Sequence, residues 1–211
     1  MGAIYNATWG RAFAALYDRG LKATEENGLR DMRREVLSGA SGRTVDLGAG
    51  TGVNLDLYPG AVSELVMVEP DPHMFKQLRA KAAGRGGVEL LEASAQELPF
   101  ADGSFDTAVF TLVLCTVPDP ELALREAARV LKPGGKLLFI EHVRAEEAGL
   151  ASWQDRLEKP WRFLADGCHC NRDTVAMIEG SPLKLELVEL GELPKTPPIV
   201  RPLVCGSAVA A

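Results

Sequence analysis

Residues 44–52 read Thr-Val-Asp-Leu-Gly-Ala-Gly-Thr-Gly, a short apolar strand followed by glycines at alternating positions. Glycine has no Cβ and tolerates positive φ, so such a loop turns sharply and lets a ligand lie against bare backbone. A strand that runs into a glycine-rich turn is typical of nucleotide sites in open α/β sheets. The spacing here is G-x-G-x-G, whereas dinucleotide sites use G-x-G-x-x-G. Because Asp46 stands two residues before the first glycine, the loop disfavours a pyrophosphate and favours a cationic ligand.

The composition predicts one α/β domain. The chain has 211 residues, of which 46% are hydrophobic and 25% are charged, enough for a full core. Its net charge of −6 argues against a nucleic-acid partner held by phosphate contacts. We find no signal-peptide pattern and no apolar run of the roughly 18 residues that a membrane helix needs. The sparse cysteines (Cys115, Cys168, Cys170 and Cys205) favour reduced thiols in a cytoplasmic protein.

Hydrophobic patterns predict a doubly wound, Rossmann-like sheet of seven strands with a helical cap at the N-terminus. The strands are expected near residues 44–47, 65–68, 88–91, 107–114, 136–140, 183–190 and 200–209, and the last two are expected to pair antiparallel. A short helix is expected from Val53 to Tyr58. Asp71-Pro72 and Asp119-Pro120 are the N-cap and first residue of two further helices.

Glu69 ends the second predicted strand and lies 19 residues after Gly50. Folds of this kind place a ribose-binding carboxylate at an offset of about 20 residues. A carboxylate there accepts hydrogen bonds from the 2′ and 3′ hydroxyls, whereas the plainer interpretation is a solvated acid at a strand end.

Two helical regions lie outside the regular βα pattern. Tyr5, Trp9 and Tyr17 recur at helical spacing in the first 37 residues, where a second helix is expected from about Leu21. This pair either packs on the sheet edge or forms a lid whose aromatic rings face substrate. Residues 144–182 form an insertion of a length that is usually functional, with Trp153 and Trp161 on a predicted helix.

Together these motifs resemble class I S-adenosylmethionine-dependent methyltransferases. Residues 45–52, Glu69, 98–100, 102–106 and 131–135 carry the general pattern. Residues 52–54, 58–59, 111–115, 141–143, 166–168 and 200–202 are similar to the methyltransferase type 11 and methyltransferase-like subfamily that includes the human alkyl thiol methyltransferases. Those human proteins begin with an apolar membrane-associated segment that this chain lacks, so we expect a soluble protein.

The resemblance implies S-adenosylmethionine as cofactor and S-adenosylhomocysteine as product. The adenine loop departs from the family pattern, because Ser94 replaces an aspartate and leaves the Ala95 amide to share the recognition. The implied cofactor-binding residues are Asp46, Gly48, Ala49, Gly50, Gly52, Asn54, Glu69, Pro70, Ser94, Ala95, Gln96, Thr111 and Leu112. The implied substrate-facing residues are Tyr5, Trp9, Tyr17, Cys115, Trp153, Trp161 and Cys168.

His142, at the mouth of the fifth strand, is the best-placed candidate base, and its plainer interpretation is a strand-end histidine bonded to backbone. Asp166 is the second candidate, as a base, as an orienter of His142 or as a turn residue.

The run Cys168-His169-Cys170 does not have zinc-ligand spacing, and no second Cys/His cluster lies near it in the sequence, so no metal is expected. Cys115 and Cys168 either touch substrate or are buried structural thiols.

The sequence thus predicts a single methyltransferase domain: a helical cap (1–42), a cofactor-binding core (43–143), a substrate-side insertion (144–182) and closing strands (183–211). We expect methyl transfer to a small molecule, with a thiol as acceptor. A phenol, amine or lipid headgroup is the alternative acceptor, and a non-catalytic S-adenosylmethionine-binding protein is the alternative of another class.

Overall fold

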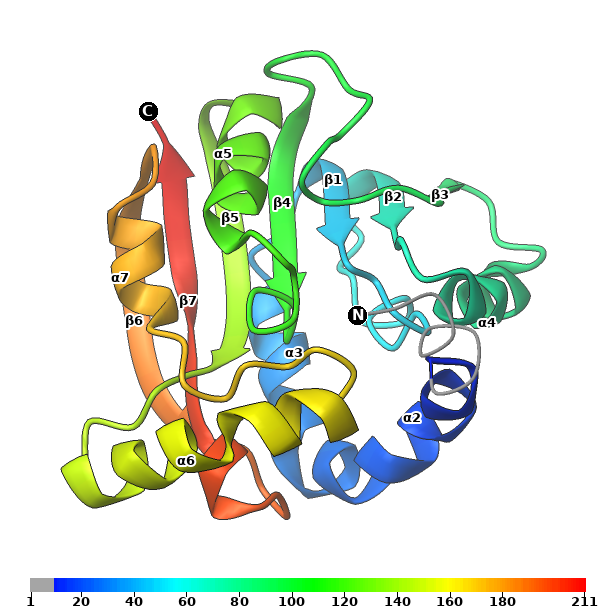
Figure 1. The fold of residues 1–211 in the computed structure, drawn as a ribbon. Helices are drawn as coiled ribbons and strands as arrows, with labels where there is room; N and C mark the ends of the chain where they lie inside the picture. The colour runs from blue at the N-terminus through cyan, green and yellow to red at the C-terminus, as the bar shows by residue number, and fades with distance from the viewer. Residues whose placement is uncertain (1–9) are drawn as a thin grey trace.

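A computed structural model of the chain describes residues 10–211, and a seven-stranded mixed sheet forms its centre (Figure 1). The strand order is β3-β2-β1-β4-β5-β7-β6. The first five strands are parallel, and β7 lies antiparallel between β5 and β6. This confirms the predicted fold and the antiparallel closing pair. The strands are β1 (Gly42–Leu47), β2 (Val62–Val68), β3 (Val88–Leu91), β4 (Phe105–Thr111), β5 (Leu131–His142), β6 (Leu183–Glu192) and β7 (Pro202–Ala210).

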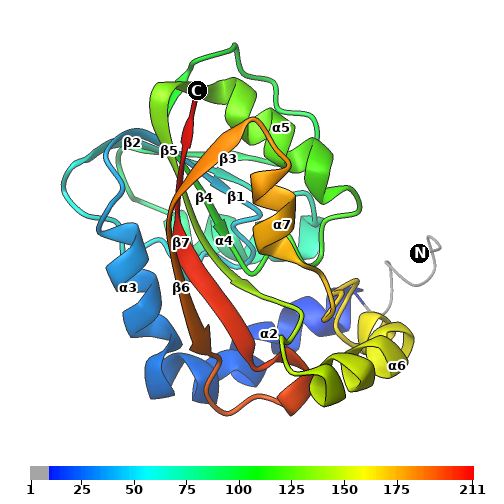
Figure 2. The same ribbon diagram turned by 90° about the vertical axis from the view of Figure 1, so that its left-hand side faces the viewer.

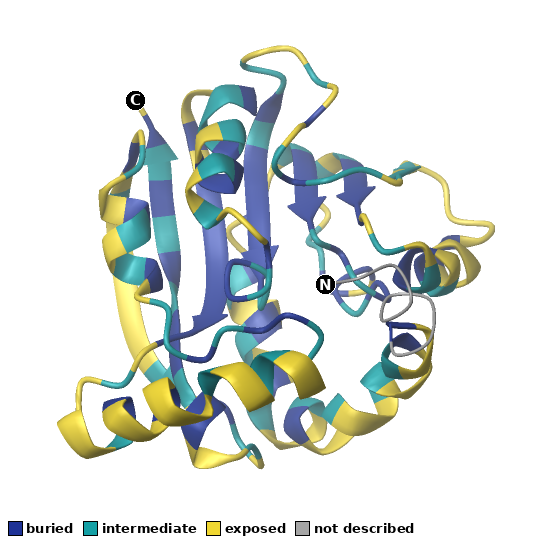
Figure 3. Cartoon of the chain, viewed as in Figure 1, coloured by how far each residue is buried: buried dark blue, intermediate teal, exposed yellow. Residues whose placement is uncertain are grey.

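Helices cover both faces of the sheet, as its apolar strands require (Figures 2 and 3). Val45 and Leu47 point toward the face packed by α5 (Pro120–Val130) and α7 (Thr174–Glu179). On the opposite face, side chains from β2, β4 and β5 pack against α3 (Arg30–Leu37) and α4 (Pro72–Ala82). Asp71 and Asp119 are N-caps whose carboxylates accept backbone amides, as the sequence predicts.

The helix expected from Val53 does not form, and that prediction is wrong. Residues 50–57 make successive turns instead. Gly52 has a φ of +82°, which starts the segment outside the helical region. Leu55 and Leu57 are buried on the α3–α4 face, and Asn54 is drawn beneath the glycine loop by buried polar partners. Tertiary contacts therefore override the local preference for a helix.

The N-terminal helices differ from the expected pair in where they bend. The helix α2 (Arg11–Thr24) leads into α3 through the segment η2 (Glu25–Leu29), in which Asn27 and Gly28 leave helical geometry. The bend lies at Gly28, whose φ is +139°, rather than before Leu21. Tyr5 and Trp9 lie outside the described residues.

The helices α2 and α6 (Ala148–Leu164) cross the carboxyl ends of the parallel strands (Figure 1). The face that α6 buries carries Ala151 and Gln154, and the Gln154 amide donates to carbonyls of Val143, Cys170 and Ile199. The turn η3 (Pro198–Val200) completes this end of the molecule. No helix within residues 10–211 combines the length and apolar character needed to cross a lipid bilayer.

Candidate active site

A cavity of about 620 Å³ lies at the carboxyl ends of the parallel strands. Open α/β sheets bind their ligands at this edge. Its walls come from the glycine loop, the ends of β2, β4 and β5, the helices α2 and α6, and residues 193–200. One cavity therefore joins the predicted cofactor wall to the predicted acceptor wall.

Glu69 and the glycine loop form one wall. The Glu69 carboxylate accepts the Gly50 amide and the Asp71 amide, both at 2.8 Å. Burial raises the pKa of Glu69 to about 7, although the two amides oppose the shift. Gly50 has a φ of +57°, and a Cβ built on it would meet no protein atom within 4 Å. The open space beside Gly50 therefore belongs to the cavity.

The structure divides the predicted cofactor residues into two groups. Those that line the cavity are Gly48, Gly50, Glu69, Pro70, Ser94, Ala95 and Leu112. Those that lie outside its wall are Asp46, Ala49, Gly52, Asn54, Gln96 and Thr111. Binding of the cofactor by the residues of either group stays a prediction.

Asp46 and Asn54 instead belong to a buried polar network beneath the loop. Asn54 donates to Asp46 and to Thr111, each at 3.0 Å, and its amide oxygen accepts Arg33 at 3.0 Å. Arg33 is 1% exposed and also reaches Glu25. Burial raises the pKa of Asp46, and the hydrogen bond from Asn54 opposes this shift. This network supports the glycine loop from below.

Gly52 and Gln96, also predicted to bind the cofactor, contact other parts of the protein instead of facing the cavity. Gly52 packs so closely that a Cβ would come within 2.7 Å of Leu78. In the adenine loop, Ser94 and Ala95 face the cavity, and the Ser94 hydroxyl accepts the Gln96 amide at 3.2 Å. The Gln96 side chain turns toward the Asp119 amide, 3.4 Å away, so it supports the loop from outside.

The opposite wall holds Tyr17, Cys115, Trp161 and Cys168, in line with the prediction for the acceptor side. Trp153 does not belong to it, because its side chain is 55% exposed and lies beside Arg156. Tyr17 is half-buried, and the loss of solvent around its hydroxyl raises the pKa of its phenol well above the usual value. The acceptor side is thus aromatic and apolar, with sulfur and imidazole groups at its base.

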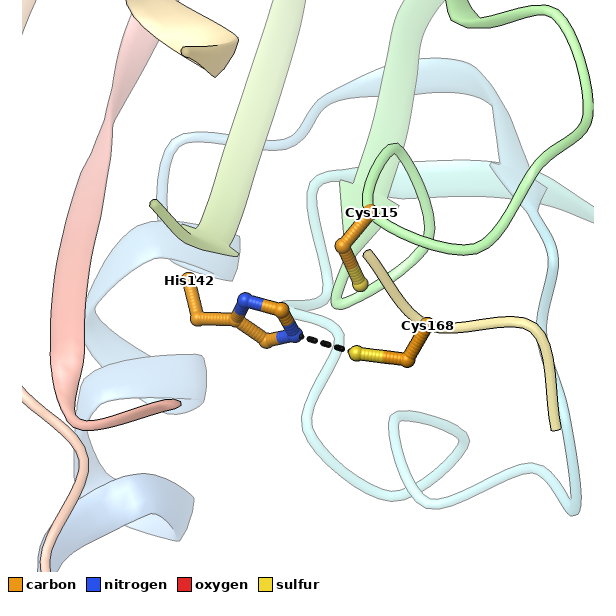
Figure 4. A group of neighbouring side chains, drawn as sticks. All are labelled: Cys115, His142 and Cys168. Carbon is orange, nitrogen blue, oxygen red and sulfur yellow. Dashed lines mark hydrogen bonds between the residues drawn. The ribbon is translucent and has the colours of Figure 1, made fainter. Parts of the chain in front are cut away.

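Three of these groups converge from separate segments (Figure 4). Cys115 follows β4, His142 ends β5 and Cys168 lies in the turn after α6, and their ligand atoms are within 4.8 Å of one another. The His142 Nε2 atom is 2.9 Å from the Cys168 sulfur, and the Trp161 indole N–H donates to that sulfur at 3.2 Å. Cys115 and His142 lie far from Cys168 in the sequence, and the fold brings the three side chains together. The expectation that no metal binds here stays a prediction.

Asp166 lines the cavity but does not orient His142. The imidazole Nδ1 is buried without a hydrogen-bond partner among the described residues, and Nε2 is occupied by Cys168. Asp166 has a φ of +47°, and burial raises its pKa, with Asp71 adding to the shift. Glu69, Asp71 and Asp166 together give the cavity an acidic rim, which suits a cationic ligand.

The thiols of Cys115 and Cys168 lie within 4.8 Å of each other and affect each other's ionisation. The nearby Cys168 and His142 side chains lower the pKa of Cys115. The nearby Cys115 and burial raise the pKa of Cys168. Cys115 is therefore the first of the pair to ionise.

Several residues that hold the site escaped the sequence prediction. The buried Glu141 carboxylate accepts the amides of Val113, Leu114 and Cys115 at 2.7, 3.0 and 3.3 Å. Arg172 bonds the carbonyls of Leu114 and Val117 in the same loop. Their signals were a charged residue inside an apolar strand and one of four arginines in the insertion, and neither indicates a partner without the fold.

The comparisons with known proteins agree with this geometry. A family model described as a methyltransferase domain matches residues 45–139. Thiol S-methyltransferase TMT1B of Homo sapiens is 35% identical over 82% of this chain and 73% of its own length. Thiol S-methyltransferase TMT1A of Homo sapiens is 35% identical over 83% of this chain and 74% of its own length. In fold, the chain is similar to a SAM-dependent methyltransferase from Thermotoga maritima, with a TM-score of 0.70 and 22% identity over 95% of this chain and 97% of that one.

Proposed function

Because this chain belongs to the class I S-adenosylmethionine-dependent methyltransferases, in one family with the human thiol S-methyltransferases, we propose that it methylates the sulfur of a small hydrophobic thiol. The observation that supports this acceptor most directly is the continuous cavity from Gly50 and Glu69 to His142 and Cys168. A methyl donor at the wall of Gly50 and Glu69 and a thiol at the wall of His142 and Cys168 would meet within this cavity.

The residues of the wall formed by Glu69 and the glycine loop fit S-adenosylmethionine. This cofactor supplies a methyl group on a positively charged sulfonium sulfur. The open space beside Gly50 accommodates a ligand against bare backbone, and Glu69 offers its remaining carboxylate lone pairs to a pair of ribose hydroxyls. Ser94 and the Ala95 amide lie where the adenine loop is expected to contribute, and Asp71 and Asp166 favour the positive charge.

The residues of the opposite wall, on the acceptor side, favour a thiol. Tyr17 and Trp161 provide apolar surface for a hydrophobic acceptor. Holding donor and acceptor in line at near-attack distance supplies much of the rate of such a displacement. A thiol with a pKa near 8.5 requires only a modest base. His142 is the titratable group at the base of this wall that is best placed to accept its proton, and Asp166 is the second candidate.

A methyl-transfer assay with matched acceptors tests this function. Each pair contains an aromatic or alkyl thiol and its hydroxyl analogue, and release of S-adenosylhomocysteine is the readout. We expect turnover on thiols and at most about a hundredth of that rate on the hydroxyl partners, because a neutral hydroxyl remains protonated and weakly nucleophilic. Equal or faster turnover on hydroxyls, amines or lipid headgroups would reject the thiol acceptor.

A further inference from the structure

The cluster of Cys115, His142 and Cys168 has the composition of a metal site. We propose that these three side chains bind one Zn²⁺ ion, and that the fourth position of the ion opens into the acceptor side of the cavity. Two thiolates and one imidazole form a ligand set that soft divalent cations select. Catalytic zinc sites use three protein ligands, including the Cys₂His set, and leave the fourth position open. All three residues line the cavity, so the open position faces the acceptor.

The distances in the cluster suit such a site after a small adjustment. The ligand atoms lie within 4.8 Å of one another, and the His142 Nε2 to Cys168 sulfur distance is 2.9 Å. Tetrahedral zinc holds a sulfur and a nitrogen ligand roughly 3.6 Å apart and two sulfur ligands roughly 3.8 Å apart, from bond lengths near 2.3 and 2.1 Å. The cation therefore replaces the hydrogen bond between His142 and Cys168 and opens that pair by roughly 0.7 Å.

The backbone around the cluster is already fixed. The His169 amide donates to the Cys115 carbonyl at 2.8 Å, which ties the two thiol-bearing loops together. Glu141 holds the Cys115 amide, and Trp161 donates its indole N–H to the Cys168 sulfur. Hydrogen bonds to ligand sulfur from such surrounding groups orient a metal ligand and stabilise its negative charge. Because hydrogen bonds already hold the three segments in place, binding of the cation orders little additional backbone.

The role of this cation in catalysis rests on the proposed thiol acceptor. An acceptor thiol that occupies the fourth position loses its proton to cavity water, and its thiolate lone pair forms the new carbon–sulfur bond. The methyl–sulfonium bond breaks at the same time, and its electron pair stays on the sulfur of S-adenosylhomocysteine. With the cation bound, His142 is a ligand, and the cation replaces it as the group that ionises the thiol.

Cobalt substitution tests the binding of the metal alone. The reduced, full-length protein is freed of metal with a chelator and titrated with Co²⁺ under anaerobic conditions. We expect one equivalent to bind with tetrahedral visible bands and a sulfur-to-cobalt charge-transfer band, and one equivalent of Zn²⁺ to displace it. Cys115→Ser and Cys168→Ser should each weaken binding by more than roughly 100-fold, since even residues that only support a ligand contribute 10- to 100-fold.

Cys205→Ser is the matched control, because Cys205 lies on β7 away from the cluster and should leave the spectrum unchanged. Near-ultraviolet circular dichroism checks that each variant is folded. Absence of the charge-transfer band in folded wild-type protein would overturn the proposal. Equal bands in wild type and in a folded Cys168→Ser variant would overturn it as well.

A second measurement separates this proposal from the proposed function. A thiol acceptor added to the Co²⁺ protein should shift its visible bands, whereas the hydroxyl analogue should not. Bound metal without methylation of any thiol would support the site and reject the proposed function. Undiminished thiol methylation by protein that binds no Co²⁺ would support the function and overturn the metal site.

Discussion

The Glu69 carboxylate accepts the Gly50 amide at 2.8 Å, so the acid at the end of β2 and the glycine loop after β1 form one rigid unit. The same carboxylate accepts the Asp71 amide and thereby reaches the start of α4. One carboxylate thus joins two neighbouring strand ends at the edge of the sheet that lines the cavity. A change at Glu69 should therefore affect cofactor binding more than it affects the fold.

Replacing Glu69 with alanine should weaken S-adenosylmethionine binding by roughly 10- to 100-fold, because hydrogen bonds to a charged group contribute about 1.5–3 kcal/mol. Isothermal titration calorimetry measures the change. Glu64→Ala is the matched control, since Glu64 lies on the same strand and pairs with Arg43 near the surface. Wild-type affinity in the Glu69 variant would remove Glu69 from the ribose-binding role.

Cofactor affinity should rise with pH because the pKa of Glu69 is raised to about 7 in the free protein. Below that pKa the carboxyl group holds a proton, and a cofactor that binds the ionised form must displace it. The affinity should therefore increase by roughly 30-fold from pH 5.5 to pH 8 and level off above pH 8. Calorimetry across this range, with Glu69→Gln beside the wild type, measures the effect. An equally steep dependence in both proteins would assign it to another group.

The sequence was sufficient to predict the sheet, the glycine loop and Glu69, because strand periodicity and short motifs are local signals. It was not sufficient to predict the network beneath the loop, in which Arg33 of α3 donates to Asn54 and Asn54 donates to Asp46. It also named Trp153 together with Trp161 as facing substrate, although only Trp161 of the two lines the cavity. Trp153 and Trp161 are two four-residue steps apart, and at 100° per residue that separation rotates them by about 80° around the helix.

The cysteine and histidine cluster was the largest omission. His142 and Cys168 are 26 residues apart in the chain, and Cys115 comes from another strand end. Only the parallel arrangement of β4 and β5 and the return of the chain after α6 bring them together. The spacing of residues within a motif can reveal metal ligands in one loop. It cannot reveal ligands that come from separate segments of the chain.

Arg33→Met should destabilise the protein by about 3–5 kcal/mol, because it leaves the buried acceptors of the network without their cation. Arg33 is 1% exposed and bonds Glu25 and Asn54, each at 3.0 Å. Urea denaturation followed by circular dichroism measures the free energy of unfolding. Arg34→Met is the matched control, since the neighbouring guanidinium is exposed and pairs with Asp31 at the surface, and it should change stability by less than about 0.5 kcal/mol. Similar losses in the two variants would contradict the role of the network.

Trp161→Ala should raise the KM for a hydrophobic thiol acceptor by roughly 10-fold or more, because it removes apolar surface of a kind that contributes about 1.5–3 kcal/mol when buried. Trp153→Ala should leave the KM unchanged, since its indole is 55% exposed and outside the cavity wall. Steady-state kinetics at saturating cofactor separates the two variants. A larger effect at Trp153 would place the acceptor on the outer face of α6.

Gly50→Ala should abolish most cofactor binding while leaving the protein folded. Both Gly50 (φ +57°) and Gly134 (φ +74°) adopt left-handed backbone, and a Cβ on either meets no protein atom within 4 Å. Alanine at each position therefore carries a similar backbone cost of about 1–3 kcal/mol. Only Gly50 lines the cavity, so only there does the new methyl group occupy ligand space. Thermal unfolding should show similar losses in the two variants, and calorimetry should show weakened cofactor binding in Gly50→Ala alone. If Gly134→Ala lost the cofactor equally, backbone strain rather than occupied space would be the cause.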